Sequence, residues 1–210
     1  HLEGEVIGRE STHLLIYKAT GHYRNPIDTI QVKDGKFEFS FDYESIEAYD
    51  LEFKEEIEIG GWQTITFFPA AQLNFLLYPT EEHLKNQIAG DIYFEQHIAK
   101  MKQDETLFYQ PLYALEEAVL EAKQGEDTVK LESLEKAFAN KLDQYYQANF
   151  TNMKKLGNPL AYYYLLLEVK YKQNSDPAYF ERVKEVYQTL AAKMPDHPYT
   201  SLLSAAFKEG

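Results

Sequence analysis

The histidines and the acidic side chains are the residues of this sequence that could bind a metal ion. Six histidines occur, and none forms a helical pair of the His-Glu-x-x-His kind. The nearest candidate cluster is Glu81-Glu82-His83 with Glu95 and His97, close to the change from a strand pattern to a helix pattern. Because such spacing is typical of a mixed, solvated charged surface, we expect no metal site and no cofactor.

Paired acids such as Glu55-Glu56 and Glu116-Glu117 are a second possible source of chemistry. Glycoside hydrolysis needs two carboxylates opposed across a cleft, and adjacent residues of a strand or helix do not point together. The sequence has no cysteine, so it contains no thiolate nucleophile and no disulfide. It also lacks the Gly-x-Ser-x-Gly, P-loop and dinucleotide-binding motifs. We therefore expect no catalytic residue and no enzymatic activity in this chain.

Aromatic residues give the strongest hint of a binding surface. The chain has 17 Tyr and 13 Phe, and aromatic side chains supply large contact areas in cores and at interfaces. Trp62, the single tryptophan, follows two glycines and could contact a partner or close the edge of the core. Tyr162-Tyr163-Tyr164 and the tyrosines near it could bind a ligand or partner, or pack between helices. The candidate partner surface comprises Trp62, Tyr162, Tyr163, Leu203 and Phe207.

The net charge of −13 restricts the classes of partner. Such a chain repels the phosphates of nucleic acids and the surfaces of anionic membranes, so we expect no nucleic-acid partner. No stretch approaches the length of about 20 apolar residues that a transmembrane helix needs, so we expect no transmembrane segment. The sequence starts at His1 without a basic and apolar signal segment, and we expect any export signal to precede it.

Strands are predicted over residues 2–80. The pattern includes short apolar or alternating runs at 13–17, 26–32, 37–41, 48–53, 63–68 and 72–78. Asp34-Gly35 separates two of these runs and predicts a tight hairpin turn, because the turn needs a positive φ. Short strands at this spacing indicate an antiparallel β-sandwich or open barrel over residues 1–88.

The hydrophobic period becomes helical from about Asp91, which predicts a helical domain over residues 89–210 with five to six helices. Gly157 is typical of a helix C-terminus, and Asn158-Pro159, Asp176-Pro177 and His197-Pro198 each place Pro at a first helical turn. No low-complexity linker separates the halves, so we expect them to pack together. The predicted fold class is thus α+β.

The β-rich half resembles the N-terminal domain of unknown function that precedes the thioredoxin-like domain in envelope thiol-disulfide oxidoreductases of the Bacteroides kind. The resemblance depends on four stretches: Leu2-Glu3-Gly4-Glu5-Val6-Ile7, the run from Ile27-Asp28-Thr29 to Asp34-Gly35-Lys36-Phe37-Glu38-Phe39, Tyr49-Asp50-Leu51, and Ile88-Ala89-Gly90. It covers residues 1–95 in detail, and the helical half only in layout.

The resemblance implies a non-catalytic accessory domain that positions a thioredoxin-like domain of the same polypeptide, or its protein substrates, or that self-associates. It also implies a location in the periplasm or on a lipid anchor in the cell envelope. The redox cysteines of the family have no counterpart here, so no catalytic residue carries over. The apolar C-terminal residues Leu202, Leu203, Ala206 and Phe207 would then face both the preceding helix and the redox domain. The alternative is a stand-alone envelope module that binds a peptide or glycan.

Overall fold

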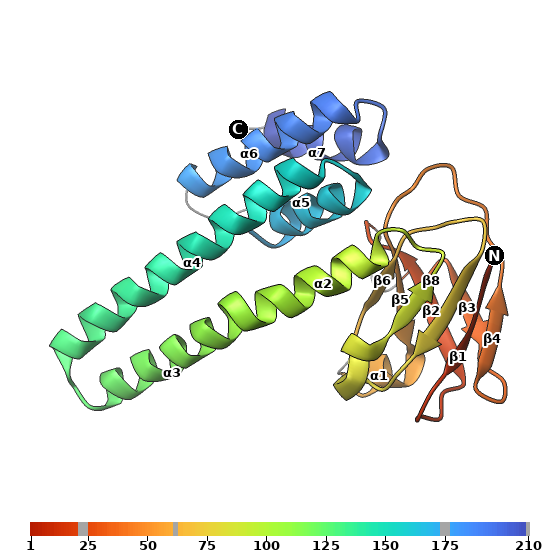
Figure 1. Cartoon of the computed structure of the whole chain (residues 1–210), viewed down its shortest axis with the longest axis horizontal. Coiled ribbons are helices and arrows are strands. Elements are labelled where there is room, and N and C mark those ends of the chain that lie inside the picture. The colour runs from red at the N-terminus through yellow and green to blue at the C-terminus, as the bar shows by residue number, and fades with distance from the viewer. Residues whose placement is uncertain (21–24, 61–62, 173–176, 209–210) are drawn as a thin grey trace.

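The computed structural model describes residues 1–20, 25–60, 63–172 and 177–208. A β-sandwich comes first and a helical half follows (Figure 1), which confirms the predicted α+β class. The change from strands to helices also occurs where the sequence pattern predicts it. The last strand ends at Ala89, and the helical half begins at Phe94.

Two four-stranded sheets form the sandwich. The first has the order β4-β1-β7-β8, with β1 Leu2–Val6, β4 Lys36–Phe39, β7 Leu73–Leu77 and β8 Gln87–Ala89. The second has the order β3-β2-β5-β6, with β2 His13–Lys18, β3 Asp28–Gln31, β5 Tyr49–Phe53 and β6 Ile65–Phe67. A short helix, α1 Lys54–Glu58, follows β5, and a 3₁₀ turn, η1 Thr80–Lys85, precedes β8. Apolar residues of both sheets alternate inward and form one core cluster.

The first sheet is not wholly antiparallel, because β1 and β7 run parallel. The chain between them crosses to the second sheet, and no local turn joins the two strands. Gly4 of β1 lies opposite both Phe37 and Phe75. A Cβ at Gly4 would lie 2.6 Å from the Cβ of Phe75, so a glycine is needed for these two rings to close over the strand with centroids 5.9 Å apart.

The predicted tight turn at Asp34-Gly35 is present, with φ values of 52° and 72°. Lys33 and Lys36 exchange backbone hydrogen bonds of 2.8 and 2.9 Å around it, as expected for a two-residue turn. The expectation of a full hairpin is wrong, however. The pairing is an isolated bridge, and β3 and β4 continue in different sheets, so the turn carries the chain from one sheet to the other.

Replacing Gly35 with Val should lower the free energy of unfolding by about 1 kcal/mol or more, because a β-branched residue resists a positive φ. Urea denaturation measures this change. Lys33→Val is the matched control, since it adds the same side chain at an exposed residue of the turn that has no positive φ. Equal midpoints for the two variants would contradict the role of Gly35.

The helical half is built on a long helical hairpin. One arm is a continuous rod made of α2 Phe94–Asp104, the π-helical segment η2 Glu105–Tyr109 and α3 Gln110–Gln124, and α4 Thr128–Leu156 returns alongside it (Figure 1). Gly157 ends α4 in the left-handed conformation. Then follow α5 Pro159–Lys172, α6 Pro177–Lys193 and α7 Pro198–Lys208, whose first residues are the predicted prolines. None of the helices in the described ranges is long and apolar enough to cross a membrane.

The two halves share a core at α5. Residues 160–166 of this helix are buried on every side, as expected for a helix at the centre of a fold. Its cluster includes Ala19, Ala48 and Phe68 from the β-sandwich. The ring of Phe68 packs edge-on against Tyr93 and Tyr163, with centroids 5.0 and 6.3 Å away. This shared core agrees with the expectation that the halves pack together.

Candidate functional site

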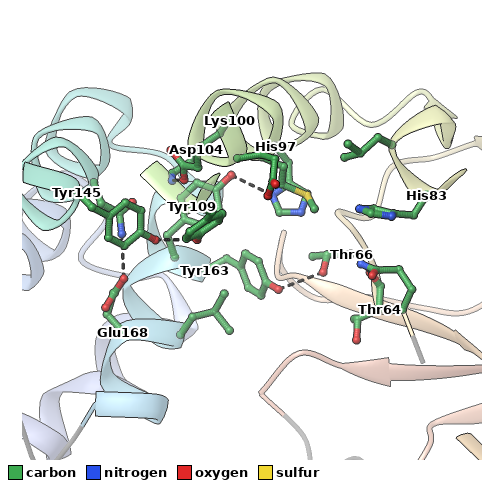
Figure 2. A pocket seen from close by; sticks show the side chains of 17 residues that line it. Thr64, Thr66, His83, His97, Lys100, Asp104, Tyr109, Tyr145, Tyr163 and Glu168 are labelled. Atoms are coloured by element: carbon green, nitrogen blue, oxygen red, sulfur yellow. Dashed lines mark hydrogen bonds and ion pairs between the residues drawn. The ribbon is translucent and has the colours of Figure 1, made fainter. Parts of the chain in front are cut away.

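A cavity of about 600 Å³ lies between the two halves, and we call it the junction cavity. Residues of α2, η2, α4 and α5 line one side of it, and residues of η1, of β6 and of the segment just before β6 line the other (Figure 2). Ligand pockets of small molecules typically enclose about 300–1,000 Å³ and lie where domains meet. The junction cavity is therefore the strongest candidate site among the described residues.

The π-helical segment η2 shapes the wall of this cavity. Pro111 has no N–H to donate to the carbonyl of Leu107, one turn earlier, and its ring crowds that carbonyl. The distortion falls on Glu105–Tyr109, the stretch that contains Leu107. Glu105 and Tyr109 line the cavity, as does Asp104 immediately before the segment. Short π-helical segments are frequent at functional sites, because they change the direction of side chains.

Tyrosine hydroxyls connect the walls by hydrogen bonds. The hydroxyl of Tyr163 lies 3.1 Å from the Oγ1 of Thr66, which donates to Asp50 over 2.8 Å. The hydroxyls of Tyr109 and Tyr145 are 3.0 Å apart. Figure 2 shows Tyr163 reaching across to Thr66, and Tyr109 and Tyr145 turned toward each other.

Three further contacts fix the polar groups of the cavity. The hydroxyl of Tyr164 lies 2.9 Å from the Nδ1 of His97. Asn149 donates to Glu168 over 2.9 Å, and the hydroxyl of Tyr179 donates to the other oxygen of the same carboxylate. Buried polar groups need such partners to offset their lost hydration. These contacts hold the side chains in fixed positions around the space.

Burial shifts the pKa values of ionisable groups at the cavity and beside it. Burial, with a smaller contribution from Lys100, lowers the pKa of His97 to about 4, so the ring is neutral at pH 7. Lys100 and Asp104 form an ion pair, and their side chains are only 14% and 13% exposed. Burial also raises the pKa of Asp50 to about 6, against the hydrogen bond from Thr66 and the charge of Lys170.

The hydroxyl of Thr66, a buried residue of the cavity wall, donates to Asp50 and lies beside the hydroxyl of Tyr163. The structure does bring His83 and His97 of the candidate metal cluster to the same cavity. Glu81, Glu82 and Glu95 are exposed outside it, and no group of three potential metal ligands gathers in the described ranges.

The candidate partner residues fall into three environments. Tyr162 and Leu203 are buried, at 0% and 2% exposure, because α5 and α7 turn them into the shared core, and no partner reaches them in this conformation. Phe207 is half-buried and stacks on Tyr187 of α6 with centroids 4.8 Å apart. Tyr163 is buried at a wall of the junction cavity. Trp62 lies outside the described residues.

Sequence reasoning missed several residues of the site. Lys100, Asp104 and Glu168 line the cavity but drew no attention among the many charged residues of the helices. One signal was present: Lys100 and Asp104 are four residues apart, a spacing that joins charges on one helix face. No residue pattern near Lys100 and Asp104 indicated that this helix face is turned toward β6.

Comparison of the chain with protein-family models, with curated proteins and with solved structures found no match.

Proposed function

We propose that this chain is a non-catalytic accessory module of a cell-envelope thiol-disulfide oxidoreductase, in which it positions a thioredoxin-like domain of the same polypeptide or that domain's protein substrates. The residue pattern of the β-rich half supports the proposal. The described strands follow that pattern: the Asp-Gly turn lies between β3 and β4, and Tyr49-Asp50-Leu51 opens β5.

The observation that carries the proposal is the attachment of α7 to the β-sandwich. The backbone N–H of Ala48 donates to the hydroxyl of Tyr199 over 3.0 Å, in a buried position. The imidazole Nε2 of His197 lies 3.0 Å from the carbonyl oxygen of Ile46. The last helix is thereby fixed to both halves, and it would give a following domain a defined orientation.

The test compares the natural full-length protein with its thioredoxin-like domain alone and with the present chain alone. We expect the present chain not to reduce insulin disulfides, because it has no cysteine. We expect the full-length protein and the isolated redox domain to reduce a small disulfide at equal rates but a protein disulfide at different rates. A natural coding sequence without a Cys-x-x-Cys domain, or equal rates on both substrates, would refute the accessory role.

The junction cavity favours a second function, the binding of a peptide or glycan by this module itself. Its volume, its position between the halves and its tyrosine-lined walls support this candidate. Such binding is compatible with an accessory role, since the ligand could be part of a protein substrate. Such binding does not require an accessory role, because the cavity lies wholly within this chain.

A further inference from the structure

An edge strand of the β-sandwich borders the junction cavity. In the described part of the chain, β6 is the last strand of the second sheet and pairs with β5 alone. Thr66 of β6 and Thr64 just before it line the cavity, and Figure 2 shows both on the β-sandwich side of the space. The outer side of an edge strand has backbone N–H and C=O groups without a ladder partner. Such groups are therefore available for hydrogen bonding at this wall of the cavity.

The ladder hydrogen bonds fix the direction in which the backbone of Thr66 points. The N–H of Ala19 donates to the carbonyl of Ala48 over 3.0 Å, in continuation of the register of β2 with β5. Backbone groups of successive residues alternate between the two neighbours of an antiparallel strand. Tyr49 therefore directs its groups toward β6, where its partner is Phe67. Thr66, adjacent to Phe67, turns its N–H and C=O away from β5.

These two backbone groups of Thr66 are shielded from bulk water. Thr66 is 6% exposed, and its contacts with Asp50 and Tyr163 are made by its hydroxyl. No other described residue forms a hydrogen bond with its N–H or its C=O. The great majority of buried backbone groups are paired, so Thr66 presents a donor and an acceptor that a ligand in the cavity can satisfy.

The helical wall of the cavity also has an acceptor without a partner. Asn149 of α4 lines the cavity and is 5% exposed, and its Nδ2 donates to Glu168 over 2.9 Å. Its Oδ1 is buried, and no described group donates a hydrogen bond to it. Buried polar groups are normally paired, so this wall, like β6, suits a ligand that has N–H donors.

From the unpaired edge of β6 we propose that the junction cavity binds an extended peptide segment, which pairs with β6 as an additional strand. An extended peptide turns the N–H and the C=O of every second residue to the same side, and these are the groups that pair with the C=O and N–H of Thr66. β6 has 3 residues, so a segment of about three to five residues matches its length. The apolar lining residues Leu84 and Met101 would contact its side chains. The proposal rests on the binding function given above and selects a peptide over a glycan.

Isothermal titration calorimetry with backbone-modified peptides tests the strand pairing. The parent probe is acetyl-Thr-Val-Thr-Val-Thr-amide, and chitotriose is the glycan probe. Two analogues of the peptide replace amides by esters, one at every threonine and the other at every valine, so that each lacks the N–H groups of one edge. We expect one analogue to bind about tenfold more weakly than the parent and the other to stay within about twofold, because only one edge of the peptide faces β6. Chitotriose should bind at least about tenfold more weakly than the parent.

Proline variants locate the pairing at β6. Thr66→Pro and Thr66→Val both remove the hydroxyl, and only Thr66→Pro also removes the N–H that points away from β5. Thr66→Pro should therefore bind the parent peptide at least about fivefold more weakly than Thr66→Val. Thr29→Pro makes the same change in β3, the opposite edge of this sheet, at an exposed residue, and it should leave binding unchanged.

The outcomes separate strand pairing from the binding function. Equal effects of the two ester analogues would overturn the proposal and leave peptide binding in place. Equal affinities of Thr66→Pro and Thr66→Val, with both folded by circular dichroism, would also overturn it. Binding of chitotriose without binding of the peptide would overturn it in favour of a glycan. No heat of binding from any probe up to about 1 mM would refute both the strand pairing and the binding function.

Discussion

Replacing Tyr162 with Ala should lower the free energy of unfolding by about 3–5 kcal/mol, the range measured when large aromatic side chains are removed from cores. Tyr162 is among the largest fully buried side chains, with 0% exposure. Its ring stacks on His197 with centroids 5.1 Å apart and meets Tyr199 edge-on. Truncation would leave a cavity where α5 and α7 meet.

Two controls accompany this variant in urea denaturation. Tyr162→Phe keeps the ring and loses only the hydrogen bond of 2.5 Å to Thr200, so it should cost about 1 kcal/mol. Tyr113→Ala makes the same truncation at a tyrosine of α3 that is 63% exposed, and it should change stability by less than about 0.5 kcal/mol. If Tyr162→Ala matched Tyr113→Ala, Tyr162 would belong to an accessible partner surface after all.

Replacing Asp50 with Asn should stabilise the protein by about 2–3 kcal/mol at pH 7. Asp50 lies opposite Thr66 in the β5–β6 ladder, and burial raises its pKa from the ordinary 3.8 to about 6. At neutral pH the folded protein therefore holds a carboxylate that would be better hydrated in the unfolded chain. An amide keeps an acceptor for the hydroxyl of Thr66 without the charge.

The sign of the pH dependence follows from this raised pKa. Between about pH 4 and 6 the folded state binds more protons at Asp50 than the unfolded state, so this group makes stability fall as pH rises through that window. A shift of about two units corresponds to about 3 kcal/mol. The stability that protonated Asp50 contributes, relative to its ionised form, is fully present below about pH 4 and is lost above about pH 6.

Urea denaturation at pH 4, 5, 6 and 7 measures the effect. The gain from Asp50→Asn should be small at pH 4 and reach its full size at pH 7. Thr66→Val should act in the opposite direction, because loss of the donated hydrogen bond raises the pKa of Asp50 further and extends the fall in stability to higher pH. A constant difference between Asp50→Asn and the wild type at all four pH values would show that the charge of Asp50 is not the cause.

The local features of the fold were readable from the sequence. The Asp34-Gly35 turn and the end of α4 at Gly157 both need a left-handed backbone, which glycine adopts without strain. Asn158 begins α5 by accepting from the N–H of Ala161 over 3.1 Å, as an N-cap residue does. In each case the interacting groups lie within a few residues of one another, so composition and spacing were sufficient.

The candidate site was readable only in part. The sequence indicated Tyr163 and the helical tyrosines as a ligand or partner surface, and it grouped His83 with His97. It could not indicate that Tyr163 faces β6 while the adjacent Tyr162 faces α7, because consecutive residues of a helix point about 100° apart and both neighbouring faces are apolar. The contact of Phe207 with Tyr187 likewise could not be read from the sequence, because it forms only when α6 and α7 pack together.

The sequence by itself therefore determined the class of each segment, the change from strands to helices near Gly90, and the absence of any thiol chemistry in this chain. The tertiary structure decided which strands pair, including the parallel match of β1 with β7, and which helix face closes the junction cavity. The physical reason is the sequence distance between the residues that interact. Turns and caps are fixed by the conformational preferences of a few adjacent residues, whereas strand order and the cavity depend on burial between segments up to about 150 residues apart, as in the contact of Ala48 with Tyr199.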